Sequence, residues 1–263
     1  MLDKSSYSIS LGNTHQDGII SSTGMDRYNV KVSADTKLTN NWSSGFTANY
    51  ITTSIDKAVT SGNGLLRTVY AAPPSYDLAG IPSHVDGNPY TQNSFRGSFD
   101  NAYWAMENNK FTEDTNRFFG NVYTSYQTDF GTTNHKLNAK YMVGVDAYTT
   151  HYVDSYGYGS NTGGGRGQIE NYGWTNATYN SLLTINYDWH INEDWGLNAV
   201  VGNEIIQSNR KKYYEYGTNY NFPGWNHINN ATTQQTEEET WKNRTVGFFG
   251  NVSASYRNML YLT

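Results

Sequence analysis

The chain has 263 residues, which is enough for one large all-β domain or two small ones. With a formal net charge of -5, it lacks the basic surplus of nucleic-acid-binding proteins. It contains no cysteine, which excludes disulfides and thiolate metal sites. No stretch approaches 18 consecutive apolar residues, which excludes a transmembrane helix. A membrane β-barrel is not excluded, because only alternate residues of its strands face lipid.

Alternating apolar and polar residues predict β-strands along the whole chain. The clearest strand is 27–38, where Tyr28, Val30 and Val32 alternate with polar residues. Successive side chains of a strand point to opposite faces, so this pattern predicts one apolar and one polar face. No amphipathic helix of three turns is evident. Further strands are expected at 7–12, 42–54, 112–130, 135–150, 168–191, 195–210 and 240–257.

One short phrase occurs twice, as FFGNVYTSY at 118–126 and as FFGNVSASY at 248–256. The two copies are too short and too far apart for a solenoid repeat, because no period of 20–50 residues runs between them. Each copy has the length and the alternation of one strand. The repetition therefore predicts two strands that occupy equivalent positions in one sheet.

The predicted connections alternate in length. Short turns are expected at 39–41, 131–134, 192–194 and 257–259, and long loops at 13–26, 55–111, 151–167 and 211–239. In an antiparallel meander successive connections lie at opposite ends of the sheet, so all the short turns share one end. That layout is typical of outer-membrane barrels, which have short periplasmic turns and long extracellular loops.

Aromatic residues flank the short turns with the parity of the apolar face. They are Trp42, Phe130, Trp189, Trp195 and Tyr256. Aromatic rings in these positions predict a girdle at the periplasmic lipid–water interface. The alternative is a secreted soluble β-sandwich that binds carbohydrate through aromatic loops, since sandwiches also alternate and bury aromatic residues. The alternating loop lengths, and strands of 16 residues or more, favour the barrel.

The long loops carry the residues best suited to bind a ligand or a partner. Aromatic rings stack on sugars, and aromatic residues together with arginine anchor protein interfaces. The alternative for each residue is ordinary loop packing. The predicted contact residues are Arg96, Tyr103, Trp104, Tyr158, Arg166, Tyr220 and Trp225.

Catalytic patterns are weak. The glycine-rich stretch 163–167 lacks the lysine and the following helix of a phosphate-binding loop. The histidines are scattered singly, and no nucleophile motif of the G-x-S-x-G type occurs. We therefore expect no enzyme activity, no cofactor and no metal site.

Several motifs resemble those of the SusC/RagA family of TonB-dependent outer-membrane transporters of Bacteroidetes. The matching positions in the most specific segment, 7–50, are Tyr7, Ser10–Gly12, Gln16–Ile20, Thr23–Gly24 and Arg27–Asn29. Weaker matches are 88–95, Asp114 with Arg117–Val122, and the closing stretch 244–263. Together these motifs follow the family's order over nearly the whole chain.

The resemblance implies a 22-stranded outer-membrane barrel plugged by an N-terminal domain. It further implies uptake of oligosaccharides or peptides powered through TonB, and a SusD-like surface lipoprotein that closes the extracellular mouth. Residues 1–263 are expected to supply eight strands and the start of a ninth, without plug domain, TonB-contacting segment or signal peptide. On this reading the chain is an internal part of the barrel and is not expected to transport anything alone.

Overall fold

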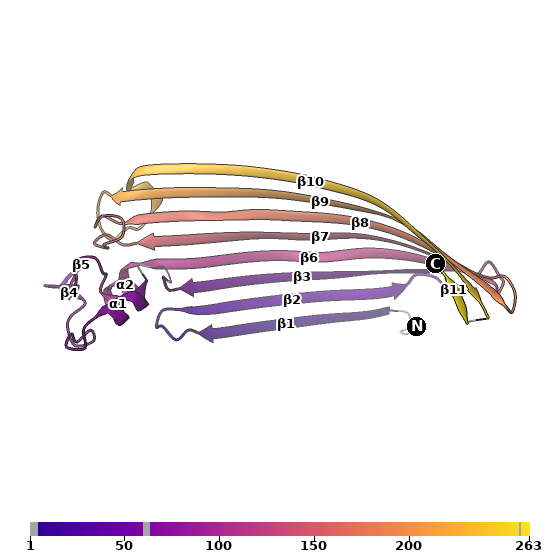
Figure 1. The fold of residues 1–263 in the computed structure, drawn as a ribbon, viewed down its shortest axis with the longest axis horizontal. Coiled ribbons are helices and arrows are strands. Elements are labelled where there is room, and N and C mark those ends of the chain that lie inside the picture. Colours follow the sequence, from indigo (N-terminus) through magenta and orange to yellow (C-terminus); the bar gives the residue numbers. More distant parts are fainter. Residues whose placement is uncertain (1–4, 60–63, 258) are drawn as a thin grey trace.

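The computed structural model describes residues 5–59, 64–257 and 259–263 and contains one nine-stranded antiparallel sheet (Figure 1). Every strand of this sheet pairs with its neighbour along the sheet in the order β1-β2-β3-β6-β7-β8-β9-β10-β11, so the predicted meander is confirmed. The strands are β1 (Ser5–Asp17), β2 (Gly24–Lys37), β3 (Trp42–Lys57), β6 (Lys110–Thr128), β7 (His135–Tyr156), β8 (Gln168–His190), β9 (Trp195–Tyr220), β10 (Ala231–Tyr256) and β11 (Leu260–Leu262).

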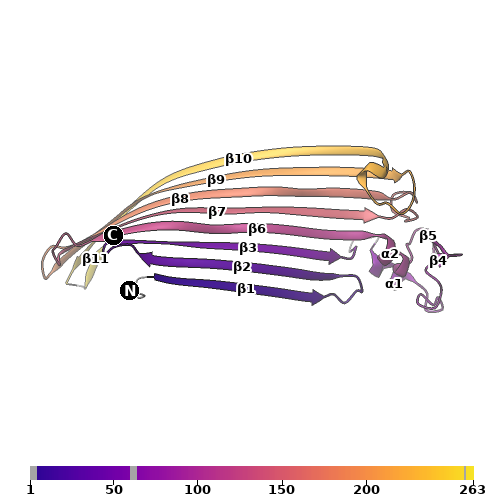
Figure 2. The same ribbon diagram turned by 180° about the vertical axis from the view of Figure 1, so that it is seen from behind.

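The sheet is a single curved layer. Views from opposite sides show that, among the described residues, neither another sheet nor a helix lies across either face of this sheet (Figures 1 and 2). The small β4-β5 sheet lies at one end of it. A sandwich needs two sheets packed face to face, so this architecture argues against the soluble alternative.

The loops gather at one end of the sheet and the short turns at the other (Figure 1). The loop end holds the hairpin of β4 (His84–Val85) and β5 (Asn88–Gln92), together with α1 (Leu65–Ala71), α2 (Ala102–Asn108) and the 3-10 turn η2 (Ile228–Asn230). The fully buried side chains also lie there, among them Trp104 and Tyr220. None of the described helices is long and apolar enough to cross a membrane.

The strands run further into the predicted loops than the sequence indicates. The connection predicted at 211–239 is only 221–230, because β9 and β10 stay paired from Tyr220 and Ala231 onward. The other long connections shrink to 18–23, 58–109 and 157–167. Alternation reveals a strand only while one face is apolar. Here both faces turn polar while the backbone pairing continues.

The turn between β6 and β7 also differs from the prediction. The sequence places Phe130 at the end of a strand, but β6 ends at Thr128 and Phe130 lies in the turn with φ 57°. Gly131 follows with φ 74°, and its amide donates to the Asp129 carboxylate at 2.9 Å. Two successive positive φ angles are typical of the tight hairpin turns that match strand twist. In the predicted turn 257–259, residue 258 lies outside the described residues.

The aromatic edge of the sheet crosses the strands obliquely. The hydrogen-bonded row through Trp42 continues through Tyr126, Ala139, Ile185 and Val201. On β9 the aromatic edge is Trp195, which lies six residues (201 − 195) below this row. Four strand spacings of roughly 4.8 Å and six steps of roughly 3.3 Å give an inclination of about 45°. Strands of closed barrels tilt by a similar angle.

Candidate functional site

The two faces of the sheet differ in chemistry. Tyr28, Val30 and Val32 lie on the apolar face. The pairing register places on the same face the even-numbered positions of β2, β3, β6 and β10, and the odd-numbered positions of β1, β7, β8 and β9. The opposite face, called the polar face below, is concave enough to hold a depression of about 620 Å³. Its lining includes Lys31, Asn49, Phe119, Asp146, Asn180 and Glu204.

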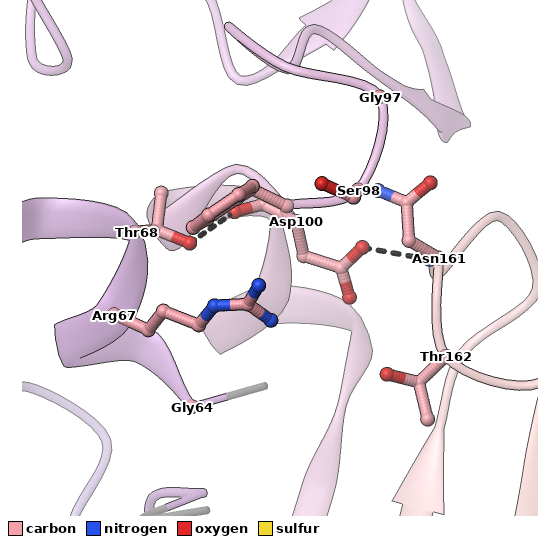
Figure 3. Close-up of a pocket in the computed structure, with 9 residues that line it drawn as sticks. Gly64, Arg67, Thr68, Gly97, Ser98, Asp100, Asn161 and Thr162 are labelled. Atoms are coloured by element: carbon pink, nitrogen blue, oxygen red, sulfur yellow. Dashed lines mark hydrogen bonds between the residues drawn. The ribbon is translucent and has the colours of Figure 1, made fainter. Parts of the chain in front are cut away.

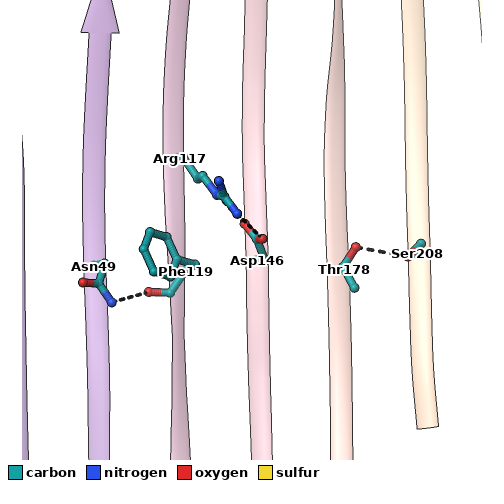
Figure 4. A network of polar contacts seen from close by, with 6 residues as sticks. All are labelled: Asn49, Arg117, Phe119, Asp146, Thr178 and Ser208. Carbon is teal, nitrogen blue, oxygen red and sulfur yellow. Dashed lines mark hydrogen bonds and ion pairs between the residues drawn. The ribbon is translucent and has the colours of Figure 1, made fainter. Parts of the chain in front are cut away.

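An ion pair between β6 and β7 borders this depression through Asp146, which belongs to its lining. Figure 4 shows the pair. Arg117 on β6 donates through Nε at 2.8 Å and through Nη2 at 2.6 Å to the two carboxylate oxygens of Asp146 on β7. The bidentate geometry fixes both side chains. Farther across the same face Asn49 donates to the Phe119 carbonyl oxygen at 3.4 Å, and Thr178 and Ser208 share a hydrogen bond of 3.0 Å. The polar face thus holds ordered donors and acceptors.

A row of aromatic side chains lies on the polar face between this depression and the loops. Tyr152 and Tyr172 stack with ring centroids 4.8 Å apart and planes at 5°, and Tyr214 follows at 6.4 Å. The Tyr172 hydroxyl donates to Asp154 at 3.1 Å. Lys57 Nζ lies 4.6 Å from the Tyr152 ring centroid, so a cation lies at one end of the row.

Arg210 extends this row toward β10. Its guanidinium lies 5.3 Å from the Trp174 ring and 5.6 Å from the Trp241 ring. Cations above aromatic faces are attracted by the ring quadrupole, so Arg210 bridges the two indoles. The aromatic row is defined as Tyr152, Tyr172, Trp174, Tyr214 and Trp241.

The aromatic row is a site that was not predicted from the sequence. Its residues fall in predicted loops or at the ends of predicted strands, whereas the pairing register places them side by side: Tyr152 opposes Tyr172, which opposes Tyr214. Aromatic residues spaced by two, as in Tyr172 and Trp174, were the available signal. Flat rings with fixed charges beside them can stack on sugar faces or on peptide side chains, and can hydrogen-bond at their edges.

Two of the predicted loop contacts are fully buried. Trp104 in α2 is 0 % exposed, and its Nε1 donates to the Pro89 carbonyl oxygen at 2.8 Å. Tyr220 at the end of β9 is also 0 % exposed and packs against Ile169 and Ala231. Burial raises the pKa of the Tyr220 hydroxyl to about 12. Either residue can reach a partner only if the loops open.

The other five predicted contacts lie nearer the surface. Tyr158 packs against the Tyr220 cluster, and Arg166 Nη2 donates to the Tyr220 carbonyl oxygen at 3.1 Å. Tyr103 and Trp225 are exposed, and Trp225 stacks between Phe222 and His227 with centroids 5.8 and 5.1 Å away. Arg96 is exposed and lies 5.6 Å from the Phe99 ring. The structure therefore brings Tyr158, Arg166 and Tyr220 together, and places the other four residues elsewhere at the loop end.

Asp100 fastens two of the loops together (Figure 3). Its carboxylate accepts hydrogen bonds from Gln92 Nε2 at 2.7 Å, from Ser160 Oγ at 2.5 Å and from the Asn161 amide at 2.7 Å. The adjoining cavity of about 230 Å³ is also lined by Arg67 and Thr162. The described parts of loops 58–109 and 157–167 thus pack together at the loop end of the sheet.

At the opposite end the predicted girdle residues form aromatic pairs. Trp42 meets Tyr126 at 5.0 Å, Trp195 meets Tyr256 at 4.8 Å, and Trp189 stacks on His135 at 5.7 Å. These rings share the apolar face. Phe130, the fifth predicted member, lies in the turn beyond β6, where it is exposed.

Solved structures share this fold. The chain matches the structure of the RagAB peptide transporter with a TM-score of 0.76 and 13% identity, covering 98% of this chain. Structures of the RagAB peptide importer in the 'closed-closed' and 'open-open' states give TM-scores of 0.77 and 0.76 at 15% and 14% identity, again over 98% of this chain.

The match is to part of a longer protein. The chain spans 29% of the length of each of the three matched chains. No protein-family model and no curated protein sequence matches it. The nine-stranded meander has the fold of a segment of the SusC/RagA transporter barrel.

Proposed function

We propose that this chain forms part of the wall of a TonB-dependent importer of the SusC/RagA family in the outer membrane. In this role the apolar face contacts lipid and the polar face lines the lumen. The observation that carries the proposal is an open band of apolar side chains with an aromatic edge, on a sheet that no other described part of the chain covers.

The band consists of exposed apolar residues that share one face. Examples are Ile9, Phe46, Val122, Val143, Leu183, Val201, Val246 and Val252, each between 38 % and 69 % exposed. An apolar surface of this extent is a liability in water and is expected in lipid. Beyond the band the same face turns polar, with Asn13, Thr52, Asn116, Thr149 and Asn209.

The height of the band fits a membrane. On β9 it runs from Trp195 to Ile205, which is ten residue steps (205 − 195). At roughly 3.3 Å per step and a tilt of roughly 40–45°, these steps cover about 25 Å along the barrel axis. The apolar belt of outer-membrane barrels has a height of about 25 Å.

The cargo is proposed to be a peptide or an oligosaccharide that passes along the polar face. The aromatic row supports this, since stacked rings flanked by Lys57, Arg210 and Asp154 suit a ligand with both flat and charged parts. A SusD-like lipoprotein is the proposed partner at the loop end, where Tyr103 and Trp225 are exposed. Energy would come from TonB through a plug domain of the complete transporter.

Neighbouring positions on β7 provide the test. The chain has no native cysteine, so single spin labels can be placed at Val143 on the apolar face and at Met142 on the polar face without interference from its own residues. In outer-membrane vesicles the label at 143 should be relaxed by dissolved oxygen, and the label at 142 by a water-soluble nickel complex. Similar water access at both positions would refute the proposal. Protection of position 143 from both agents would indicate a packed protein interior.

A further inference from the structure

Charges on the apolar face, beyond its apolar band, differ between strands. On β1, β2, β3 and β6 the charged residues there are mainly acidic: Asp17, Asp26, Asp56 and Asp114. On β9 and β10 the acidic residues Glu215 and Glu238 lie toward the loops, and three basic residues lie next to the band: Lys211, Lys242 and Arg244. We call these three residues the basic patch.

The basic patch has an ordered frame. Arg244 donates through Nε to Gln207 Oε1 at 3.0 Å, and its Nη2 contacts the same oxygen. Lys242 lies opposite Asn209 in the register, and Lys211 opposite Thr240. Six neighbouring outward positions therefore carry three cations and three neutral polar side chains.

Within β9 and β10, part of the positive charge of the patch is uncompensated. Lys211 Nζ lies 2.7 Å from the Glu238 carboxylate on the same face. Within the part of the chain that the structure describes, neither Lys242 nor Arg244 forms an ion pair. The patch with Glu238 keeps a net charge of +2 (three cations minus one anion), all of it on exposed side chains.

The patch begins at the depth of lipid head groups. Arg244 lies in that layer, while Lys242 and Lys211, which is opposite Thr240, lie beyond it and would reach it with their long side chains. Val246 and Ile205 are the last apolar residues of the band on β10 and β9, and Arg244 and Lys242 lie two and four residues beyond Val246. At roughly 3.3 Å per residue and a tilt of roughly 40–45°, these positions are about 5 and 10 Å above the band. The head-group layer is on the order of 5–8 Å thick on each side of the hydrocarbon core.

We propose that the basic patch binds the phosphate groups of a phosphorylated glycolipid in the outer leaflet. This inference rests on the proposed function, which places the patch on the lipid side of the barrel wall. Cargo is not a candidate ligand, because the patch lies on the face opposite the aromatic row. Arg244 offers planar donors to a phosphate, and Lys242 and Lys211 provide point charges whose long stems can follow the lipid surface.

The test measures binding of lipid A that carries both phosphates to the purified, delipidated protein in neutral detergent with a chelator present. The double variant Lys242→Gln/Arg244→Gln should lose roughly tenfold or more in affinity, as expected when two charge-assisted contacts are removed. Lipid A stripped of phosphate should bind wild type and variant alike. The matched control is Lys212→Gln, one residue from Lys211 but on the polar face, where Lys212 pairs with Glu239 at 3.7 Å. It should bind like wild type.

Three results would overturn the inference: equal affinity of wild type and the double variant, an equal loss in Lys212→Gln, or inorganic phosphate binding as tightly as the lipid. Failure of the proposed function has a different signature. In that case the spin label at 143 would not report lipid, and lipid A would bind no better with its phosphates than without them. If only the inference fails, the label at 143 still reports lipid while the double variant keeps its affinity.

Discussion

The apolar and polar faces of this sheet share every strand, yet they differ in what holds their side chains. On the polar face side chains are tied to one another, as in the bidentate pair of Arg117 with Asp146 and the stack of Tyr152 on Tyr172. On the apolar face Val122, Val143 and Val201 remain between 46 % and 59 % exposed. The contrast is the one that the proposed function requires, with lipid on one side of the sheet and water on the other.

The largest expected effect comes from a charge placed in the apolar band. Val143→Arg should destabilise the folded barrel in lipid by about 2–4 kcal/mol, because a cation near the bilayer midplane loses its hydration. Met142→Arg, the adjacent residue on the polar face, should change stability by less than about 1 kcal/mol. Urea unfolding in lipid vesicles measures both. Equal losses would mean that the two faces share one environment.

The aromatic row is expected to give the next largest effect. Trp174→Ala removes a ring that contacts both Arg210 and Tyr152. It should weaken cargo binding by about tenfold, since aromatic contacts contribute on the order of 1 kcal/mol each. Calorimetric titration with pools of short peptides and of oligosaccharides would measure the loss and identify the cargo class.

The control for the aromatic row lies on the same strand. Tyr179 is exposed on the apolar face of β8, opposite Val145. Tyr179→Ala should leave cargo affinity unchanged. If it weakens binding as much as Trp174→Ala, the polar face is not the one that meets cargo.

The next effect is expected at the loop end, where Asp100 joins two loops. Asp100→Asn weakens the two hydrogen bonds from Ser160 and Asn161 that join loops 58–109 and 157–167, and a third from Gln92 within the first loop. Amide exchange near Gln92 and Ser160 should therefore quicken by about tenfold, which corresponds to roughly 1.4 kcal/mol. The control is Asp77→Asn, whose carboxylate bonds only the nearby amides of Ala79 and Gly80 at 3.2 and 2.9 Å. It should change exchange only there. Unaltered exchange around Ser160 in Asp100→Asn would show that other contacts join the loops.

Most of the meander could be predicted from the sequence, because each strand that crosses the apolar band has apolar residues at alternate positions. The pattern ends near Ile205 on β9, and so did the prediction at residue 210, although the strand continues to Tyr220. The strand ends nearest the loops are held by backbone pairing with neighbouring strands. Such pairing produces no hydrophobic periodicity where both faces of the strand are polar. The aromatic row lies in this region and depends on register between strands far apart in sequence, so it could be assembled only from the structure.

Which of the predicted loop contact residues are exposed was harder to predict, for a related reason. Composition identifies Trp104 and Trp225 equally as large aromatic residues, but a hydrogen bond to the Pro89 carbonyl oxygen and close packing hide the first while the second stays exposed. Which aromatic residue of a long loop packs inward depends on the path of the whole loop. Short turns leave less freedom, and there four of the five predicted girdle residues, all but Phe130, lie on the apolar face in strands.

The smallest expected effect concerns the pair of Arg117 and Asp146, and it bears directly on the solvent of the polar face. Both side chains are partly exposed, 45 % and 38 %, so a double-mutant cycle with Arg117→Gln and Asp146→Asn should give a coupling free energy of at most about 1 kcal/mol. Because water and ions reach a lumen, this coupling should fall further as salt is raised. A coupling of several kcal/mol that ignores salt would instead describe a pair shielded from water. The polar face would then be packed against another part of the protein, and the aromatic row beside it could not be open to cargo.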